Sequence, residues 1–195
     1  MVTTDLIKEL RDTTGVSVMQ CKKALEEAGG DKDKALIILK KKGAEAAAKK
    51  GDRTLASGTI QSYIHSTGTS GVMVELACET DFVAKNDEFK KLAHDIAMHI
   101  AAMRPEFLKK DDITPEDKAL AASVFEKEVE GKHEDMKAKI LEGKLDAYFA
   151  DRVLMNQPFV KNPELTIEGL ISQAVQKFGE KTELVRFVRY GLLEK

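Results

Sequence analysis

Residues 57–78 read SGTIQSYIHSTGTSGVMVELAC, and their pattern decides the fold. On each side of a central STGTSG run, apolar residues recur at every second position, which is the period of a β-strand. The alternating positions are Ile60, Ser62 and Ile64 before the run, where Ser62 is the one polar member, and Val72, Val74, Leu76 and Cys78 after it. The central run consists of serine, threonine and glycine, which favour turns. The stretch therefore predicts a β-hairpin with a one-sided apolar face.

Segments after the hairpin predict helices around the sheet and one more strand. Residues 89–103 and 167–178 carry apolar side chains at helical spacing, and Pro105 and Gly179 end the two stripes. The run ELVRFVRY, which ends at Tyr190, is rich in β-branched and aromatic residues and predicts a third strand. The expected fold class is therefore α+β, with a small antiparallel β-sheet and flanking helices.

A helical arm is expected over about residues 104–160, between the two stripes. Thr114 is followed by a proline, which is typical of a helix start. The run KHEDMKAKILEGKLDAYFADRVLM (132–155) predicts further short helices, broken at Gly143.

The first 53 residues predict a separate N-terminal domain, a bundle of three short helices. Ser17 has a glutamine three residues later, which is the spacing of a capping box, and Gly43 is expected to close the third helix. Residues 54–195 are then the α+β core or dimerisation domain, which includes the arm.

Lysines cluster in KKKGAEAAAKKGDR (40–53), for which two interpretations remain open. The run has the positive charge of a nucleic-acid patch, but it contains no aromatic residue on which a base could stack. Its alanine content favours a helical linker with a solvated face.

Composition excludes several classes of protein. The 31 basic and 33 acidic residues give a net charge of −2, so no overall field attracts nucleic acid or a membrane. No apolar run approaches the ~18 residues of a membrane span, and MVTTDLIKEL lacks the plan of a signal peptide. The two cysteines, Cys21 and Cys78, belong to no CxxC pair and are expected to be buried thiols in a reducing cytoplasm.

Two places carry apolar residues outside the predicted stripes. Met19, in the first turn of the second helix, is a candidate for a partner surface, whereas neighbouring Val18 fits either that surface or the core. The other is CETDFVAKND (78–87), between the hairpin and the next helix. Phe82 belongs to neither apolar face, so it is either an exposed contact residue or a hydrophobic staple on the following helix.

Motifs that carry chemistry are not found in the sequence. It has no GxSxG, no Walker phosphate loop and no GxGxxG. His94 and His99 are five residues apart, so they point about 140° away from each other on a helix and do not form a zinc pair. We therefore expect no catalytic residue, no metal site and no cofactor, and the protein is not expected to be an enzyme.

Three longer motifs resemble those of one family. RDTTGVSVMQCKKALEEAGGD (11–31), TDFVAKND (80–87) and EGKLDAYFADRVLMNQPFVKNP (142–163) are similar, in this order, to motifs of bacterial elongation factor Ts. That family consists of guanine nucleotide exchange factors for elongation factor Tu. Longer members carry a duplicated core and only one core unit fits here, so the resemblance implies a short form in which a second copy supplies the missing half.

The resemblance also implies roles for individual residues. The N-terminal bundle would be UBA-like and would dock on elongation factor Tu through Val18 and Met19. Thr80, Asp81, Phe82 and Val83 would enter the partner's nucleotide domain near its Mg²⁺ site, and Phe82 would act as a wedge. The expected partners are the GDP-bound and nucleotide-free forms of elongation factor Tu and a second copy of the chain, with no direct nucleic-acid or membrane contact.

Rival interpretations come from other classes. A small helical bundle with a basic linker is also compatible with a nucleic-acid-binding module. A structural dimerisation protein would show the same hairpin and helices, but it gives no role to the corner at residues 80–83.

Overall fold

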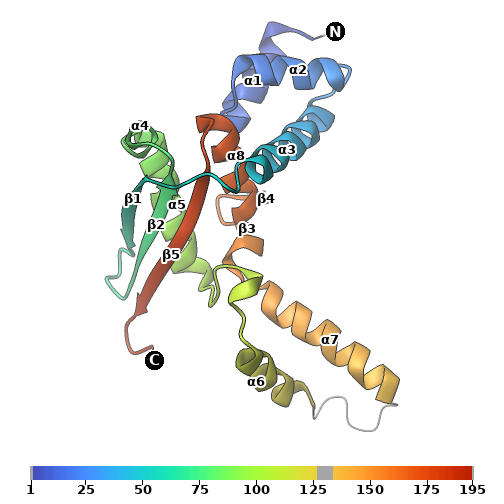
Figure 1. Cartoon of the computed structure of the whole chain (residues 1–195), viewed down its shortest axis with the longest axis vertical. Coiled ribbons are helices and arrows are strands. Elements are labelled where there is room, and N and C mark those ends of the chain that lie inside the picture. The colour runs from blue at the N-terminus through green and yellow to red at the C-terminus, as the bar shows by residue number, and fades with distance from the viewer. Residues whose placement is uncertain (1, 127–133, 195) are drawn as a thin grey trace.

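Helices and a small antiparallel sheet make up the chain, which confirms the α+β class (Figure 1). The structure is a computed structural model and describes residues 2–126 and 134–194. The helices are α1 (Thr4–Thr14), α2 (Val18–Glu27), α3 (Lys32–Lys49), α4 (Asp81–Ala84), α5 (Asp87–Met103), α6 (Pro115–Glu126), α7 (Glu134–Ala150) and α8 (Ile167–Phe178). The strands are β1 (Ser57–Ile64), β2 (Ser70–Cys78), β3 (Pro158–Phe159), β4 (Asn162–Thr166) and β5 (Thr182–Gly191), and 3-10 turns lie at Lys110–Asp112 and Leu154–Asn156.

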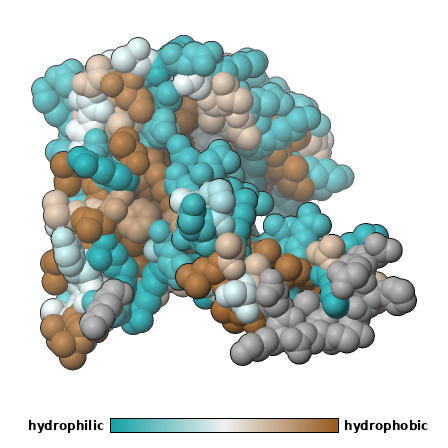
Figure 2. Space-filling model, turned by 60° about the horizontal axis from the view of Figure 1, so that its bottom comes forward, coloured by the Kyte–Doolittle hydropathy of each residue, from teal (hydrophilic) through white to brown (hydrophobic). Residues whose placement is uncertain are grey.

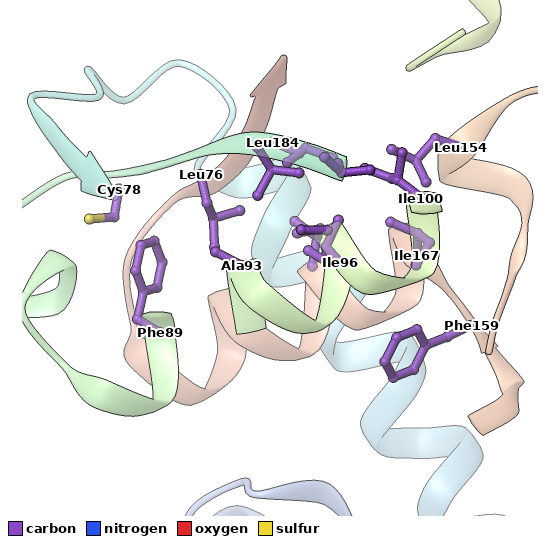
Figure 3. Packing of buried hydrophobic residues seen from close by; sticks show 14 of the residues in the cluster. Leu76, Cys78, Phe89, Ala93, Ile96, Ile100, Leu154, Phe159, Ile167 and Leu184 are labelled. Carbon is purple, nitrogen blue, oxygen red and sulfur yellow. The ribbon is translucent and has the colours of Figure 1, made fainter. Parts of the chain in front are cut away.

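The main sheet has the order β1-β2-β5, and both strand pairs are antiparallel. The predicted third strand is therefore confirmed as β5, which returns from the far end of the chain to pair with β2. Helix α5 packs across one face of this sheet, and α8 lies behind it (Figure 3). The apolar side chains between these layers form the main core. Its largest fully buried members are Leu76, Phe89, Ile96, Ile100, Leu154, Ile167 and Leu184.

The prediction of a one-sided apolar hairpin is wrong for β1. Val72 and Val74 of β2 are 1% exposed and face α5, as expected. Ile60 and Ile64, however, pair with Glu75 and Gly71 on the opposite face, where they are 59% and 66% exposed. Alternation in a sequence shows that a strand has two different faces, but not which of them another element covers.

A second, smaller group of buried side chains lies in the N-terminal bundle. Its residues are Leu10, Val16, Cys21, Ala24, Leu25, Ala35 and Leu39. The predicted cap is confirmed, because the Ser17 hydroxyl accepts a hydrogen bond from the backbone N–H of Gln20. The separate cores are compatible with separate domains, but the boundary at residue 53 stays a prediction.

Gly43 does not close the third helix, contrary to expectation. Helix α3 continues to Lys49, and Gly43 is buried within it. A Cβ atom at this position would lie 3.4 Å from the carbonyl oxygen of Ser172 in α8. The glycine therefore lets two helices approach closely, and this packing offsets its low helix propensity.

The predicted arm contains α6 and α7, which pack on each other away from the sheet (Figure 1). Helix α6 starts at the expected proline, and the Thr114 hydroxyl accepts a hydrogen bond from the N–H of Asp117. Helix α7 runs through Gly143 without a break, so that part of the prediction is wrong. The first two residues of the run predicted to form it, 132 and 133, lie outside the described residues.

A buried histidine joins α5 to the segment that follows the arm. His99 is fully buried, and its Nε2 lies 3.0 Å from Oε1 of Gln157. Its Nδ1 accepts a hydrogen bond from the backbone N–H of Val160 at 3.2 Å. Because Nδ1 accepts and Nε2 donates, the ring is neutral. Burial lowers the pKa of His99 below its ordinary value of 6.5.

The stability of the fold should therefore fall in mild acid. Below about pH 6.5 the unfolded chain binds a proton at His99 that the folded protein does not bind, so the free energy of unfolding decreases until the pH passes the lower folded pKa. Thermal unfolding at about pH 7.5 and about pH 5.5 measures this loss. In His99→Gln the loss should be smaller, and an unchanged loss would show that His99 is not its source.

Candidate functional site

The corner between β2 and α5 is built by two helix caps. Thr80 has an extended backbone and its hydroxyl accepts from the N–H of Val83 at 3.5 Å, which starts the single turn of α4. Asn86 then caps α5, with its side-chain oxygen accepting from the N–H of Glu88 at 2.8 Å. Because the two capping residues are only six positions apart, the connection between strand and helix is short and its backbone is held at both ends.

Opposite sides of the corner differ in burial. Val83 and Ala84 are 5% and 7% exposed and belong to the main core, whereas Phe82 is 81% exposed. The staple interpretation of Phe82 is therefore wrong, because a staple would be covered by the helix it packs on. The Phe82 ring therefore lies in solvent, while the backbone that carries it is held by the burial of Val83 and Ala84 in the main core.

Asp81 is exposed beside this ring. Lys85, one turn later, donates a 2.6 Å hydrogen bond to its carboxylate. This bond is the main reason why the pKa of Asp81 lies below its ordinary value, so the side chain is a carboxylate at neutral pH. Both partners are largely exposed, so the ion pair can exchange for contacts with another molecule.

The N-terminal bundle presents a second pair of exposed apolar side chains. Val18 and Met19 are 51% and 63% exposed in the first turn of α2, so Val18 is not a core residue. Val16, which is 1% exposed, fills the core at this place instead. The prediction of a buried Cys21 is confirmed, and burial raises the pKa of its thiol.

Helix α8 lies between the two candidate surfaces (Figure 1). Near its end, Lys177 donates a 2.7 Å hydrogen bond to Glu88 in the first turn of α5. The same lysine lies against the loop before α2, since a Cβ atom at Gly15 would be 3.2 Å from its Nζ. The corner and the bundle are thus linked through one helix.

Over residues 2–126 and 134–194, no group of three or more histidine, cysteine, aspartate or glutamate side chains is arranged to hold a metal ion. In the same ranges, no helix is both long and apolar enough to cross a membrane.

These features define an α+β protein that presents apolar side chains on a fixed backbone, an arrangement suited to binding another protein. Comparison with known proteins then gives the family. The family model described as "Elongation factor TS" matches residues 47–194, and the chain belongs to the elongation factor Ts family. Its members act in translation elongation, and this role therefore applies to the chain.

Several relatives are similar over nearly their whole length. Elongation factor Ts of Carboxydothermus hydrogenoformans is 46% identical over 100% of this chain and 90% of its own. The protein of the same name from Thermodesulfovibrio yellowstonii is 47% identical, over 97% and 95%. That of Thermosipho melanesiensis is 44% identical over 100% of both chains. This relative therefore aligns with the chain over its whole length.

Proposed function

We propose that this chain is the guanine nucleotide exchange factor of elongation factor Tu, and that it binds the GDP-bound and nucleotide-free forms of that partner. The proposal depends mainly on the exposure of Phe82. Its aromatic side chain is 81% exposed, although the two residues that follow it, Val83 and Ala84, are buried. Exposure of a large apolar ring costs solvation free energy, and here the fold maintains that exposure.

In this proposal, each of residues 80–83 has a separate role in binding the partner or in holding the corner. Phe82 inserts between side chains of the partner's nucleotide domain, near the Mg²⁺ ion that neutralises the phosphates of GDP. Asp81 exchanges its contact with Lys85 for polar groups at the same place. Val83 does not reach the partner, because it is 5% exposed; it anchors the turn in the core, while Thr80 caps the turn. A ring on a fixed backbone loses little conformational entropy on insertion.

Exchange of this kind is negative coupling between two ligands of one protein. The factor weakens GDP binding to elongation factor Tu, so GDP weakens binding of the factor by the same ratio. No covalent bond is made or broken, so the chain acts as a binding protein. Calorimetric titration into nucleotide-free and GDP-bound elongation factor Tu tests this. The affinity should be lower with GDP, and equal affinities would contradict the proposal.

Docking of the N-terminal bundle on the same partner is the second part of the proposal. Met19→Asp should weaken binding to elongation factor Tu by about tenfold or more, because it puts a charge into an apolar contact. Far-UV circular dichroism should not change, since Met19 is 63% exposed. Binding is measured by calorimetric titration into nucleotide-free elongation factor Tu.

The matched control is Ile37→Asp, at an equally exposed residue (65%) of α3 in the same bundle. This substitution should leave affinity nearly unchanged if the contact is confined to the start of α2. An affinity unaffected by Met19→Asp would remove that residue from the interface.

Basic residues of the linker mostly have partners within the chain, which favours a structural linker over a nucleic-acid patch. Lys40 donates to the carbonyl of Glu164, and Lys50 to that of Gly179. Arg53 donates to both carboxylate oxygens of Glu79, at 3.1 and 3.0 Å. Such contacts connect residues 40–53 to the α+β core.

A second copy of the chain is the partner proposed for the open sheet face. Helix α5 covers one face only, and hydrophobic surface gathers on the side of the molecule that carries the sheet (Figure 2). The exposed apolar residues of the open face are Ile60, Ile64, Met73, Val188 and Tyr190. Two-fold pairing of such faces buries like against like, and a stable dimer needs roughly 1,000 Å² of buried surface.

Sedimentation equilibrium under reducing conditions should therefore give a mass of about twice the chain mass of 21.6 kDa. Met73→Asp, at the middle strand of the face, should shift the mass to that of the monomer, because the new charge would be desolvated in the dimer. A mass near 21.6 kDa for the unchanged protein at micromolar concentration would contradict the dimer.

A further inference from the structure

The loop after α8 brings a carboxylate to the corner. Helix α8 ends at Gly179, whose φ of 73° is in the left-handed region and whose N–H bonds to the carbonyl of Val175 at 3.0 Å. Glycine adopts this conformation at little cost, and it turns the chain toward the end of β2. The next residue, Glu180, then lies beside the start of α4.

Glu180 binds both donors of Thr80. Its Oε2 accepts from the backbone N–H of Thr80 at 3.0 Å, and its Oε1 accepts from the hydroxyl at 2.6 Å. The two residues are 100 positions apart in the chain. With its proton given to Glu180, the hydroxyl turns a lone pair toward the N–H of Val83, which it caps. One carboxylate thus fixes both the backbone and the capping side chain of the corner.

Neighbouring contacts hold Glu180 itself in place. The backbone N–H of Lys181 donates to Oε1 of Glu79 at 2.5 Å, and this bond is the main reason why the pKa of Glu79 is lowered. The Nζ of Lys181 donates to the carbonyl oxygens of Gly51 and Arg53, at 2.6 and 3.2 Å. The loop is therefore fixed to β2 on one side and to the segment after α3 on the other.

We propose that Glu180 is a positioning residue for nucleotide exchange: by holding Thr80 it sets the direction in which Asp81 and Phe82 leave the corner. The inference rests on the proposed exchange function. Glu180 acts through Thr80 and need not touch the partner. Without the carboxylate, Val83 still anchors the turn in the core, but the side-chain cap of α4 is a single 3.5 Å hydrogen bond, and a four-residue helix has little stability of its own. The corner then holds Asp81 and Phe82 in the orientation that binds the partner for only part of the time.

The test is the rate of fluorescent GDP release from elongation factor Tu, measured against the concentration of the factor. Glu180→Ala should lower the maximal rate by about tenfold, the effect expected for loss of charge-assisted hydrogen bonds that hold one conformation. The half-saturating concentration should change little, because the bundle still docks. Glu180→Gln keeps one acceptor oxygen and should restore part of the rate. Glu45→Ala is the control: within the described residues the exposed side chain of this α3 glutamate makes no hydrogen bond or ion pair, so the variant should exchange like the unchanged protein.

A double variant separates positioning from a general loss of stability. Glu180→Ala should cause little further loss in a Phe82→Ala background, because the side chain that it directs is already gone. Additive losses, or a maximal rate unaffected by Glu180→Ala, would overturn the inference. Should Glu180→Ala fail to fold, Glu180→Gln is carried through the same cycle. If the unchanged protein does not accelerate GDP release, the proposed function fails. If Phe82→Ala exchanges normally, the role of its ring and the inference built on it fail, but the exchange function stands. If only the Glu180 variants exchange normally, the positioning role alone fails.

Discussion

Phe82→Ala should slow factor-stimulated GDP release at least about thirtyfold, because truncation of an aromatic anchor in an interface costs on the order of 2–4 kcal/mol. The melting temperature should change by no more than a few degrees, since Phe82 is 81% exposed and makes no part of either core. Stopped-flow fluorescence measures the rate, and differential scanning calorimetry measures the melting temperature.

Leu120→Ala is the control for this variant. Leu120 is 71% exposed on α6 and lies away from the corner, so its truncation removes an exposed apolar side chain without touching the proposed site. Its exchange rate should match that of the unchanged protein. A Phe82→Ala protein that is unfolded, or one that is folded and fully active, would contradict the assignment of the ring to the partner.

Phe89→Ala should have the opposite profile and destabilise the protein by about 3–5 kcal/mol, the usual cost of removing a buried phenylalanine. Phe89 is fully buried between the sheet and α8 (Figure 3), and its ring packs edge-on against Phe178 with centroids 5.6 Å apart. Because small domains are stable by only about 5–15 kcal/mol, much of the folding free energy would be lost. Urea unfolding followed by circular dichroism measures the difference.

Phe89→Leu provides the comparison within the core. Leucine keeps most of the apolar volume, so this variant should lose less than about 1.5 kcal/mol. Phe82→Ala would then reduce exchange with little loss of stability, whereas Phe89→Ala would reduce stability, although the two phenylalanines are only seven positions apart. A Phe89→Ala protein as stable as the original would show that the core does not depend on this contact.

Local chemistry explains which parts of the fold were predictable from the sequence. The helix starts at Ser17 and Thr114 and the helix stop at Gly179 depend on neighbours within a few residues, and the structure has them as predicted. The same pattern marks the corner, because Phe82 fits neither neighbouring stripe, and the exposure of its side chain agrees with that pattern.

Features that depend on contacts between distant segments were missed. Gly43 has the propensity of a helix end, but packing against α8 overrides it. Gly143 has no such contact: α7 continues through it, because a single glycine lowers helix stability by only about 1 kcal/mol. The outward face of Ile60 follows from the position of α5 on the other side of the sheet. The hydrogen bond between Thr80 and Glu180 joins residues 100 positions apart, so no local sequence pattern predicts it.

The exchange function itself is tested by GDP release from the cognate elongation factor Tu, with this protein added at increasing concentrations. Fluorescent GDP is bound first and chased with an excess of unlabelled nucleotide, and the release rate is recorded by stopped flow. The release rate should rise with the concentration of the protein to a plateau far above the spontaneous rate, and the plateau should be much lower with Phe82→Ala. A release rate that stays at the spontaneous value at every concentration would contradict the exchange function.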